Sequence, residues 1–332
     1  MSIDRRRLLT GAAGVAAAGT LGALGAGSAA ASGTSSSAQT RGPVTGEARA
    51  QAFDLALLDV NRNTVDVFSS GGQFTDDNLK QRLTFPGQDP LECRLRAIPH
   101  SRPQPLLPAF LACGGFPGRG WVSIHSNDGT RLWSDGLTNY PHCVEYLEGT
   151  GAFVVAGSRG GLQLYVSDSS SVASIRKIGR PYPFPKAHGV LWDPKYQVLW
   201  AHGGRQLVPY KVTGTQENTR LAAQRPFWAG FRNGHDIQPD YTDDDILIAT
   251  DSDHVYRIDK TKSGVQPEII SNRKWVKGYS RHPSGQGVWT AAPQDGSDIF
   301  GTDEVHFSWP EGLTRRPGGK IYKARLMLAP YQ

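Results

Sequence analysis

The chain has 332 residues, a formal net charge of +6 and a hydrophobic content of 38%. Three arginines and one aspartate lie near the N-terminus, so the rest of the chain carries only +4, which argues against a nucleic-acid-binding protein. Glycine (39) and proline (22) are abundant and long amphipathic stretches are scarce, which favours an all-β fold of many short strands over a helical one.

Residues 1–31 have the pattern of an export signal. Arg5 and Arg6 precede a weakly apolar Ala/Gly/Leu stretch, and three alanines at its end offer a small-residue cleavage site. This resembles a twin-arginine signal, with Asp4 where serine or threonine is more usual, and an ordinary secretory signal is the alternative. No stretch is suited to span a bilayer as a helix. The sequence therefore predicts a secreted, extracellular protein exported by the twin-arginine pathway.

A repeated unit begins at Phe53, after small, polar residues 32–52 that we expect to form a disordered linker. Strongly apolar segments such as "GAFVVAGS", "QVLWAHGG" and "DILIATDS" alternate with segments such as "LQLYVSDS" and "HVYRIDKT". A period in the forties with four short strands per unit is typical of a β-propeller blade. Residues 53–332 are therefore predicted to form a single propeller of six blades.

Two alternatives to the six-blade propeller remain open at this point. A seventh blade would require a strand hidden in loops such as residues 295–302, and a β-sandwich is the other all-β architecture considered.

The first unit lacks an inner segment, while the chain ends in a regular strand, "KIYKARLMLAP". We expect this last strand to close the ring against the first, which removes exposed sheet edges. The cysteines Cys93, Cys113 and Cys143 are odd in number, and we expect them to be buried and apolar rather than a disulfide framework.

Histidines recur at the start of successive inner strands. His142, His188 and His235 are 46 and 47 residues apart, close to the length of one blade. One such histidine alone would be explained by a hydrogen bond to a neighbouring strand or a trapped water. Three at matching positions indicate a ring at one mouth of the central channel. Alignment on the turns adds cationic residues to this ring, namely Lys277 and either Arg94 or Arg96.

Such a ring has the residue types needed to remove a proton next to a carboxylate. Lysine or arginine would neutralise the carboxylate, and a histidine would act as the base near neutral pH. Tyr279 or another histidine would then protonate the leaving oxygen. Together these steps are β-elimination from a uronic acid.

Further residues are weaker candidates for the same site. Asp236 could orient an imidazole, Trp192 could stack on a sugar, and His202 lies beside two glycines in a predicted loop. As an alternative to acid–base chemistry, His142, His188 and His235 could hold a divalent metal ion, since neutral imidazole is a common ligand. The residues alone do not decide between these uses.

The chain resembles a DUF6528-like family of exported bacterial proteins of unassigned function with a domain related to WD40-type propellers. The resemblance rests on "PHCVEYL", "AHGVLWDPKYQVLWA", "GHDIQPD" and "KIYKARL". The arrangement is also similar to propeller-fold polysaccharide lyases, including those that cleave rhamnosyl-glucuronate linkages. That similarity implies that a histidine of the channel mouth is the base and that Lys277 with Arg94 or Arg96 holds the uronate.

Two functions follow as hypotheses. The first is a secreted, monomeric carbon–oxygen lyase whose partner is an acidic polysaccharide or another anionic small ligand. The second is a non-catalytic propeller that binds a glycan or a protein at the cell surface. Other enzymes, such as a metal-dependent hydrolase, remain further alternatives, because function inferred from a shared fold is weakly supported.

Overall fold

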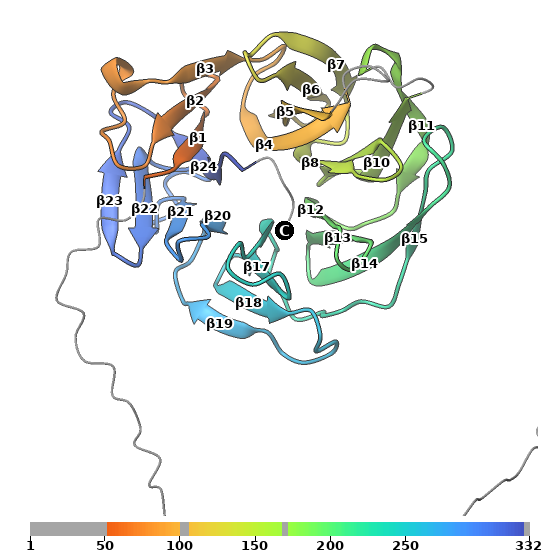
Figure 1. Ribbon diagram of the computed structural model, residues 1–332. Coiled ribbons are helices and arrows are strands. Elements are labelled where there is room, and N and C mark those ends of the chain that lie inside the picture. The colour runs from red at the N-terminus through yellow and green to blue at the C-terminus, as the bar shows by residue number, and fades with distance from the viewer. Residues whose placement is uncertain (1–51, 100–105, 168–171, 329–332) are drawn as a thin grey trace, which may run out of the picture. The chain divides into compact units, whose positions relative to one another are not determined.

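Six four-stranded antiparallel sheets surround a central axis in the computed structural model (Figure 1). The structure describes residues 52–99, 106–167 and 172–328, all within the compact unit Arg49–Gln332. The predicted export signal and residues 32–51 of the predicted linker lie outside the described residues. The prediction of an all-β propeller with six blades is confirmed, and the loop around residues 295–302 contains no seventh-blade strand.

The blades are numbered along the chain, with the innermost strand first. Blade one is β24 (Ile321–Leu326), β1 (Asp54–Asp59), β2 (Thr64–Ser69) and β3 (Gln81–Thr84). Blade two is β4 (Pro90–Pro99), β5 (Leu106–Phe116), β6 (Arg119–Ser126) and β7 (Arg131–Leu137). Blade three is β8 (Pro141–Leu147), β9 (Ala152–Gly157), β10 (Gly161–Ser167) and β11 (Ile175–Tyr182).

The second half of the ring repeats this order. Blade four is β12 (Ala187–Asp193), β13 (Val198–Gly203), β14 (Gln206–Thr213) and β15 (Arg220–Ala223). Blade five is β16 (Asp236–Pro239), β17 (Ile246–Thr250), β18 (Val255–Asp259) and β19 (Glu268–Ser271). Blade six is β20 (Val276–Arg281), β21 (Gly287–Ala291), β22 (Glu304–Ser308) and β23 (Gly312–Arg315).

The ring closes by pairing its last strand with its first, as the sequence predicts. β24 runs antiparallel to β1, with Leu326 opposite Leu55 and Ala324 opposite Leu57. In Figure 1 the blue β24 lies beside the red-orange β1. Residues far apart in the sequence therefore complete one blade, and the inner sheet edge of blade one is covered.

The apolar second strands supply the contacts between blades. All residues of β9 are buried, and its Val154 and Ala156 pack in one cluster with Val190 of β12 and Leu199 of β13. Burying such side chains contributes about 1.5–3 kcal/mol each. Each blade thus buries both of its faces only because a neighbour covers it.

Helix is almost absent from the described part of the chain. It contains two single-turn 3₁₀ helices, η1 (Asp76–Asn78) and η2 (Val172–Ser174). None of the helices in the described ranges is long and apolar enough to cross a membrane. All three cysteines are buried and unpaired, which confirms the expectation that they pack as small apolar residues.

Candidate functional site

A repeated kink at the start of the inner strands shapes one mouth of the channel. In blades two, three, four and six, one extra residue is inserted where the inner strand pairs with the second strand. These β-bulge residues are Leu91, His142, His188 and Lys277. His235 precedes β16 in the matching place, and its backbone N–H donates to the carbonyl of Thr250 at 2.8 Å. Bulges redirect side chains and are common beside functional sites.

A second feature lies two residues before each of these positions. There the backbone is left-handed, with φ between 51° and 59°, although none of the residues is glycine. They are Asp89, Tyr140, Lys186, Asn233 and Trp275. Such conformations are uncommon in side-chain-bearing residues and concentrate at functional positions. The second strand approaches closely here: a Cβ on Gly203 would lie 2.1 Å from the carbonyl oxygen of Lys186, which explains the glycines that end "AHGG".

The three predicted histidines meet at this mouth. The rings of His142 and His188 lie 4.1 Å apart between centroids, and those of His188 and His235 lie 5.4 Å apart, edge to face. The ring of Tyr140 packs on His142 at 4.4 Å. Tyr322, from the closing strand β24, places its hydroxyl 3.4 Å from Nδ1 of His142. Four blades therefore contribute side chains to a single cluster.

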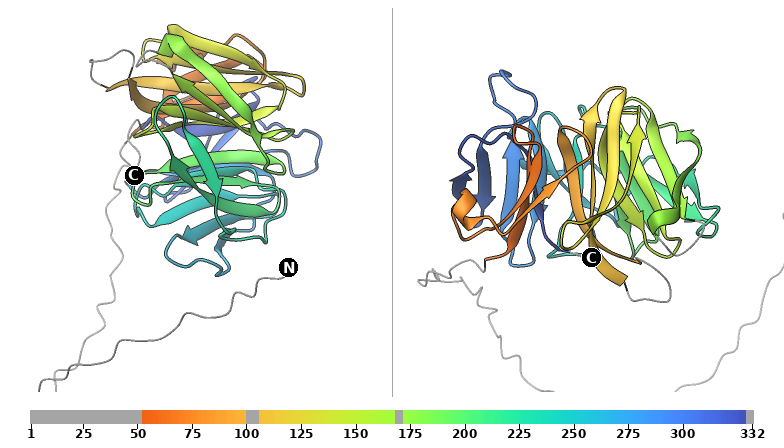
Figure 2. Two further views of the ribbon diagram at one scale, coloured as in Figure 1. Left: turned by 90° about the vertical axis from the view of Figure 1, so that its right-hand side faces the viewer. Right: turned by 90° about the horizontal axis from the view of Figure 1, so that it is seen from above.

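The cluster forms the floor of a cavity of about 420 Å³. Its walls come from Trp275, Pro293, Ile299 and Phe300, and Lys277, Asn233 and Asp298 add polar groups. Several of these residues belong to the loop 292–303 between β21 and β22. In the right-hand view of Figure 2 this loop, in blue, rises above the blades. The volume and the mainly apolar walls are typical of a small-molecule site.

Burial keeps the imidazoles neutral. It lowers the pKa of His188 to about 4, with the positive charges of Lys323 and Lys277 adding to the effect. Burial also lowers the pKa values of His142 and His235 well below the ordinary value, again assisted by these neighbours. At neutral pH each ring therefore has one nitrogen that accepts and one that donates.

Half of the six imidazole nitrogens are buried and have no partner among the described residues. Neither ring nitrogen of His235 has one, nor does Nε2 of His142, although these side chains are only 6% and 5% exposed. Nδ1 of His188 donates to the carbonyl oxygen of Lys186 at 2.9 Å when it carries the proton. Buried polar atoms are usually hydrogen-bonded, so these nitrogens are available to a ligand or to water.

Lys277 is the cation of the cavity. Its side chain is 5% exposed, and its ammonium lies 5.8 Å from the centre of the Trp275 ring. Burial and, to a smaller degree, the charge of Lys323 lower its pKa to about 8. Both the charged and the neutral form of this amine are therefore accessible near neutral pH.

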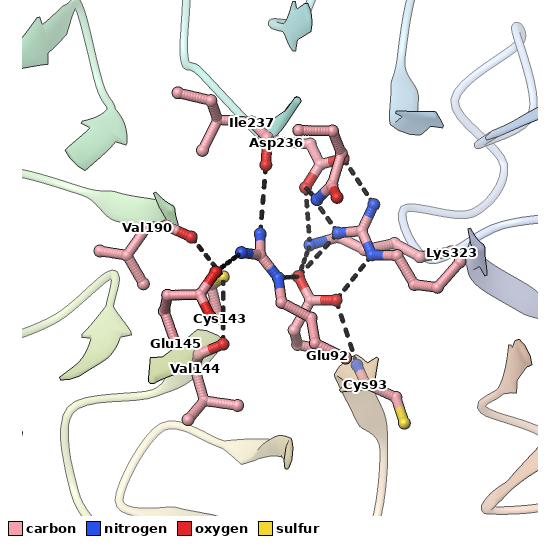
Figure 3. Close-up of polar contacts among 12 residues, drawn as sticks. Glu92, Cys93, Cys143, Val144, Glu145, Val190, Asp236, Ile237 and Lys323 are labelled. Carbon is pink, nitrogen blue, oxygen red and sulfur yellow. Dashed lines mark hydrogen bonds and ion pairs between the residues drawn. The ribbon is translucent and has the colours of Figure 1, made fainter. Parts of the chain in front are cut away.

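The two candidate arginines lie deeper in the channel and do not line the cavity. Arg94 donates to Glu145 at 2.5 Å, and Arg96 holds the same carboxylate at 2.8 and 2.9 Å. Figure 3 shows Glu145 beside Glu92, Asp236 and Lys323 around the axis. In blade two the bulge residue that matches His142 and Lys277 is Leu91, which packs in the core and does not line the cavity.

Asp236 belongs to the same interior cluster. Arg325 donates to both oxygens of Asp236 at 2.6 and 2.7 Å and to both oxygens of Glu92 at 2.6 Å. Lys323 lies 3.2 Å from Glu92 and 3.5 Å from Asp236. Burial alone would raise the pKa values of these carboxyls, but Arg325 and Lys323 lower them below the ordinary range. Asp236 is thus a structural anion and does not orient an imidazole by any hydrogen bond the structure shows.

Three further candidates are not brought to the cavity. The hydroxyl of Tyr279 pairs with Ser308 Oγ at 3.0 Å, and its ring packs in the core between blades five and six. Trp192 packs in the core between blades three and four. His202 lies behind His235, fully buried, with Nε2 3.1 Å from the carbonyl of Thr250.

The histidines do not form a ready metal site. In the part of the chain that the structure describes, one group of at least three acidic, histidine or cysteine ligands has its donor atoms within 4.8 Å of one another, and it consists of the adjacent surface residues Asp243, Asp244 and Asp245. His142, His188 and His235 do not meet this spacing.

Sequence analysis missed several residues of the cavity. Asn233 and Trp275 lie two residues before His235 and Lys277, as Tyr140 lies two before His142. This shared offset was visible in the repeat and could have identified them. Tyr322 and Phe300 gave no such signal, since one comes from the closing strand and the other from an irregular loop.

Comparisons with known proteins agree with the fold. A solved structure described as "Crystal structure of Nidogen/Laminin Complex" is similar over 84% of this chain and 99% of that chain, with a TM-score of 0.57 and 10% identity. At that identity the likeness concerns the fold alone. No curated protein matches the sequence. A family of unknown function, DUF6528, matches residues 119–331, which is well over half of the sequence. The chain therefore belongs to the DUF6528 family.

Proposed function

We propose that the protein is a lyase that cleaves uronic-acid-containing polysaccharide by β-elimination in the histidine cavity. The observation that carries this proposal is the placement of three neutral imidazoles, two of them buried and that of His188 half-buried, beside the unpaired cation Lys277. A base that is unprotonated at neutral pH and a cation for the carboxylate are the two groups that this reaction needs most.

The residues of the cavity divide the reaction between them. The charged form of Lys277, with imidazole N–H groups, holds the uronate carboxylate and stabilises the negative charge that develops next to it. A neutral imidazole, for which His188 is our choice, takes the proton from the carbon beside the carboxylate. The carbon–oxygen bond to the leaving sugar then breaks, and a carbon–carbon double bond forms.

The leaving oxygen needs a proton, and Tyr140 is the group placed to give it. It lines the cavity and packs on His142. Burial and the nearby charge of Asp89 raise its pKa, so it carries its proton at neutral pH. Tyr140 therefore takes the role that the sequence assigned to Tyr279. The apolar faces of Trp275 and Phe300 offer surfaces on which sugar rings can pack.

The ultraviolet absorbance of the unsaturated uronate tests this function. The purified protein is incubated with a panel of acidic polysaccharides that includes gum arabic, beside His188→Ala and a chelator-treated sample. We expect the absorbance to rise, and the rate to fall by about 10²–10⁴-fold in His188→Ala. His306→Ala is the matched control, because His306 stacks on Trp289 in blade six outside the cavity.

The outcomes separate the two hypotheses. If no polysaccharide gives a rise but one of them binds in a His188-dependent manner, the protein is the non-catalytic propeller. If the rate is unchanged in His188→Ala, the elimination site lies elsewhere. Loss of activity in the chelator-treated sample alone would show that a metal ion takes part.

We also propose that the chain is secreted through the twin-arginine pathway. Support comes from Arg5 and Arg6 ahead of the weakly apolar segment within residues 1–31. Replacing both arginines by lysine should abolish the appearance of the protein outside the cytoplasm, as measured by fractionation. Unchanged export of that variant would favour an ordinary secretory signal.

A further inference from the structure

Lys277 differs from the other buried lysines of the described chain in having no counter-ion. Lys260 pairs with Asp193 at 2.6 Å, and Lys323 pairs with Glu92 at 3.2 Å. No hydrogen bond or ion pair from the described residues reaches the ammonium of Lys277, and the nearby carboxylate of Asp298 is held by Lys320 at 2.5 Å. A lysine that only stabilised the fold would be expected to have such a partner.

The charged groups around Lys277 favour its neutral form. Lys323 on β24 opposes its charge, Asp298 in the loop 292–303 supports it weakly, and burial is the largest influence. The three imidazoles that face it are neutral. A desolvated lysine next to another cation is the usual arrangement of a nucleophilic amine.

We propose that Lys277 is a carbonyl-reactive residue, whose amine forms an imine with a small 2-oxo acid that enters the cavity. The cavity has room for such a molecule beside the amine. One ring nitrogen of His235 and Nε2 of His142 can each donate to its carboxylate when they carry the proton of the neutral ring. This inference uses the proposed cavity but does not depend on the elimination reaction.

The chemistry balances with the groups present. The amine nitrogen of Lys277 attacks the carbonyl carbon, and a carbon–nitrogen single bond forms while the carbonyl oxygen becomes a hydroxyl. The first amine proton is the one that makes this hydroxyl. The second amine proton, relayed by a neighbouring imidazole or Tyr140, converts the hydroxyl to water, which leaves as the carbon–oxygen bond breaks and the carbon–nitrogen double bond forms. The product is an imine and one water molecule, and no oxidant or metal is needed.

Reductive trapping tests the proposal on the intact protein. Pyruvate and sodium cyanoborohydride are added at pH 7, the borohydride supplies the hydride that reduces the imine to a stable amine, and peptide mass spectrometry locates the adduct. The neutral fraction of a lysine with a pKa of about 8 exceeds that of an ordinary lysine by roughly a hundredfold at this pH. We therefore expect Lys277 to be labelled on the order of 100-fold faster than Lys262, whose side chain is 63% exposed.

Two variants and one analogue sharpen the result. Lys277→Arg keeps a cation but not a nucleophilic amine, so it should lose the adduct while retaining uronate binding. Lys262→Arg is the matched control and should leave labelling of Lys277 unchanged. Propionaldehyde lacks the carboxylate. With this reagent the ratio of labelling at Lys277 to labelling at Lys262 should be at least tenfold lower than with pyruvate.

Each result decides the matter. Adducts spread over surface lysines without preference for Lys277 would overturn the proposal. Equal preference for propionaldehyde would overturn the assignment of a 2-oxo acid. Trapping at Lys277 in a protein without lyase activity would leave this inference standing and remove the proposed function.

Discussion

The mouth of the channel and the interior just below it are built from neighbouring residues of the chain. Their polar groups nevertheless differ: those of the interior are paired, and many of those at the mouth are not. His142 at the mouth precedes Cys143 inside, His235 precedes Asp236, and Tyr322 precedes Lys323. Inside, each carboxylate is held by at least two cationic side chains at hydrogen-bonding distance. At the mouth, three of the six ring nitrogens are buried without a partner among the described residues, and no described residue forms an ion pair with the amine of Lys277. The interior thus fixes the geometry of the ring, whereas the mouth has buried nitrogens that no described residue satisfies.

Breaking the interior should have the largest effect. Arg325→Met removes the side chain that holds both Glu92 and Asp236 and leaves two buried carboxylates with fewer cations. The free energy of unfolding should fall by about 3–5 kcal/mol, as measured by urea denaturation. The control is Lys262→Met, which breaks the exposed pair with Asp259 and should cost less than about 1 kcal/mol. Equal losses in the two variants would contradict the contrast.

The pH dependence of the free energy of unfolding should distinguish the mouth from the interior, with a smaller effect than that of Arg325→Met. The folded pKa of His188 is about 4, below the unfolded value of about 6.5, so the unfolded chain takes up this proton first as the pH falls. The contribution of neutral His188 to the free energy of unfolding is therefore complete above about pH 6.5 and is lost as the pH falls from 6.5 to 4. Glu92 also has a depressed pKa, so its contribution is present above about pH 4.3 and is lost below it.

Equilibrium unfolding across this pH range measures both contributions. His188→Gln should make the loss of stability in the upper window less steep, since His142 and His235 also contribute there, and should leave the lower window intact. A curve for His188→Gln that matches the unmodified protein between pH 6.5 and 4 would show that His188 is not neutral in the folded state.

The smallest expected effect concerns an unpartnered histidine. In His235→Leu two buried nitrogens without partners are replaced by apolar atoms, so the free energy of unfolding should stay the same or rise by up to about 1 kcal/mol. In His202→Leu a hydrogen bond to the carbonyl of Thr250 is lost, and stability should fall by about 1–3 kcal/mol. Differential scanning calorimetry compares the two, and destabilisation of both to the same degree would remove the distinction.

The fold and the histidine cluster could be predicted from the sequence because both follow from the repeat. Each blade copies the same strand lengths, and the bulge recurs at one place, so His142, His188 and Lys277 arrive at one level. The spacing alone shows this without any knowledge of side-chain contacts. The closing strand was predictable for a similar reason, because the first unit lacked its inner segment.

The remaining candidates were misplaced because the bulge changes the alternation of side chains. Counting from the turns put Arg94 and Arg96 at the mouth, whereas counting from the bulge gives Leu91 as the matching residue. Two residues after Lys277, Tyr279 faces the core between blades, and Gly278 faces the interior cluster, where a Cβ would lie 3.0 Å from Arg325. A left-handed backbone at Tyr140 or Trp275 has no sequence signal, because neither residue type favours it.

The closing strand determines when, during synthesis, the mouth of the channel can be completed. Tyr322, Lys323 and Arg325 lie on β24, the last strand of the described chain, and they complete both the mouth and its support. During synthesis blades two to six and three strands of blade one leave the ribosome before these residues. A chain truncated before β24 therefore has all three histidines in its sequence but lacks Tyr322 beside His142 and the arginine that holds Glu92 and Asp236, so the histidine cluster and its support are completed in a single late step of translation.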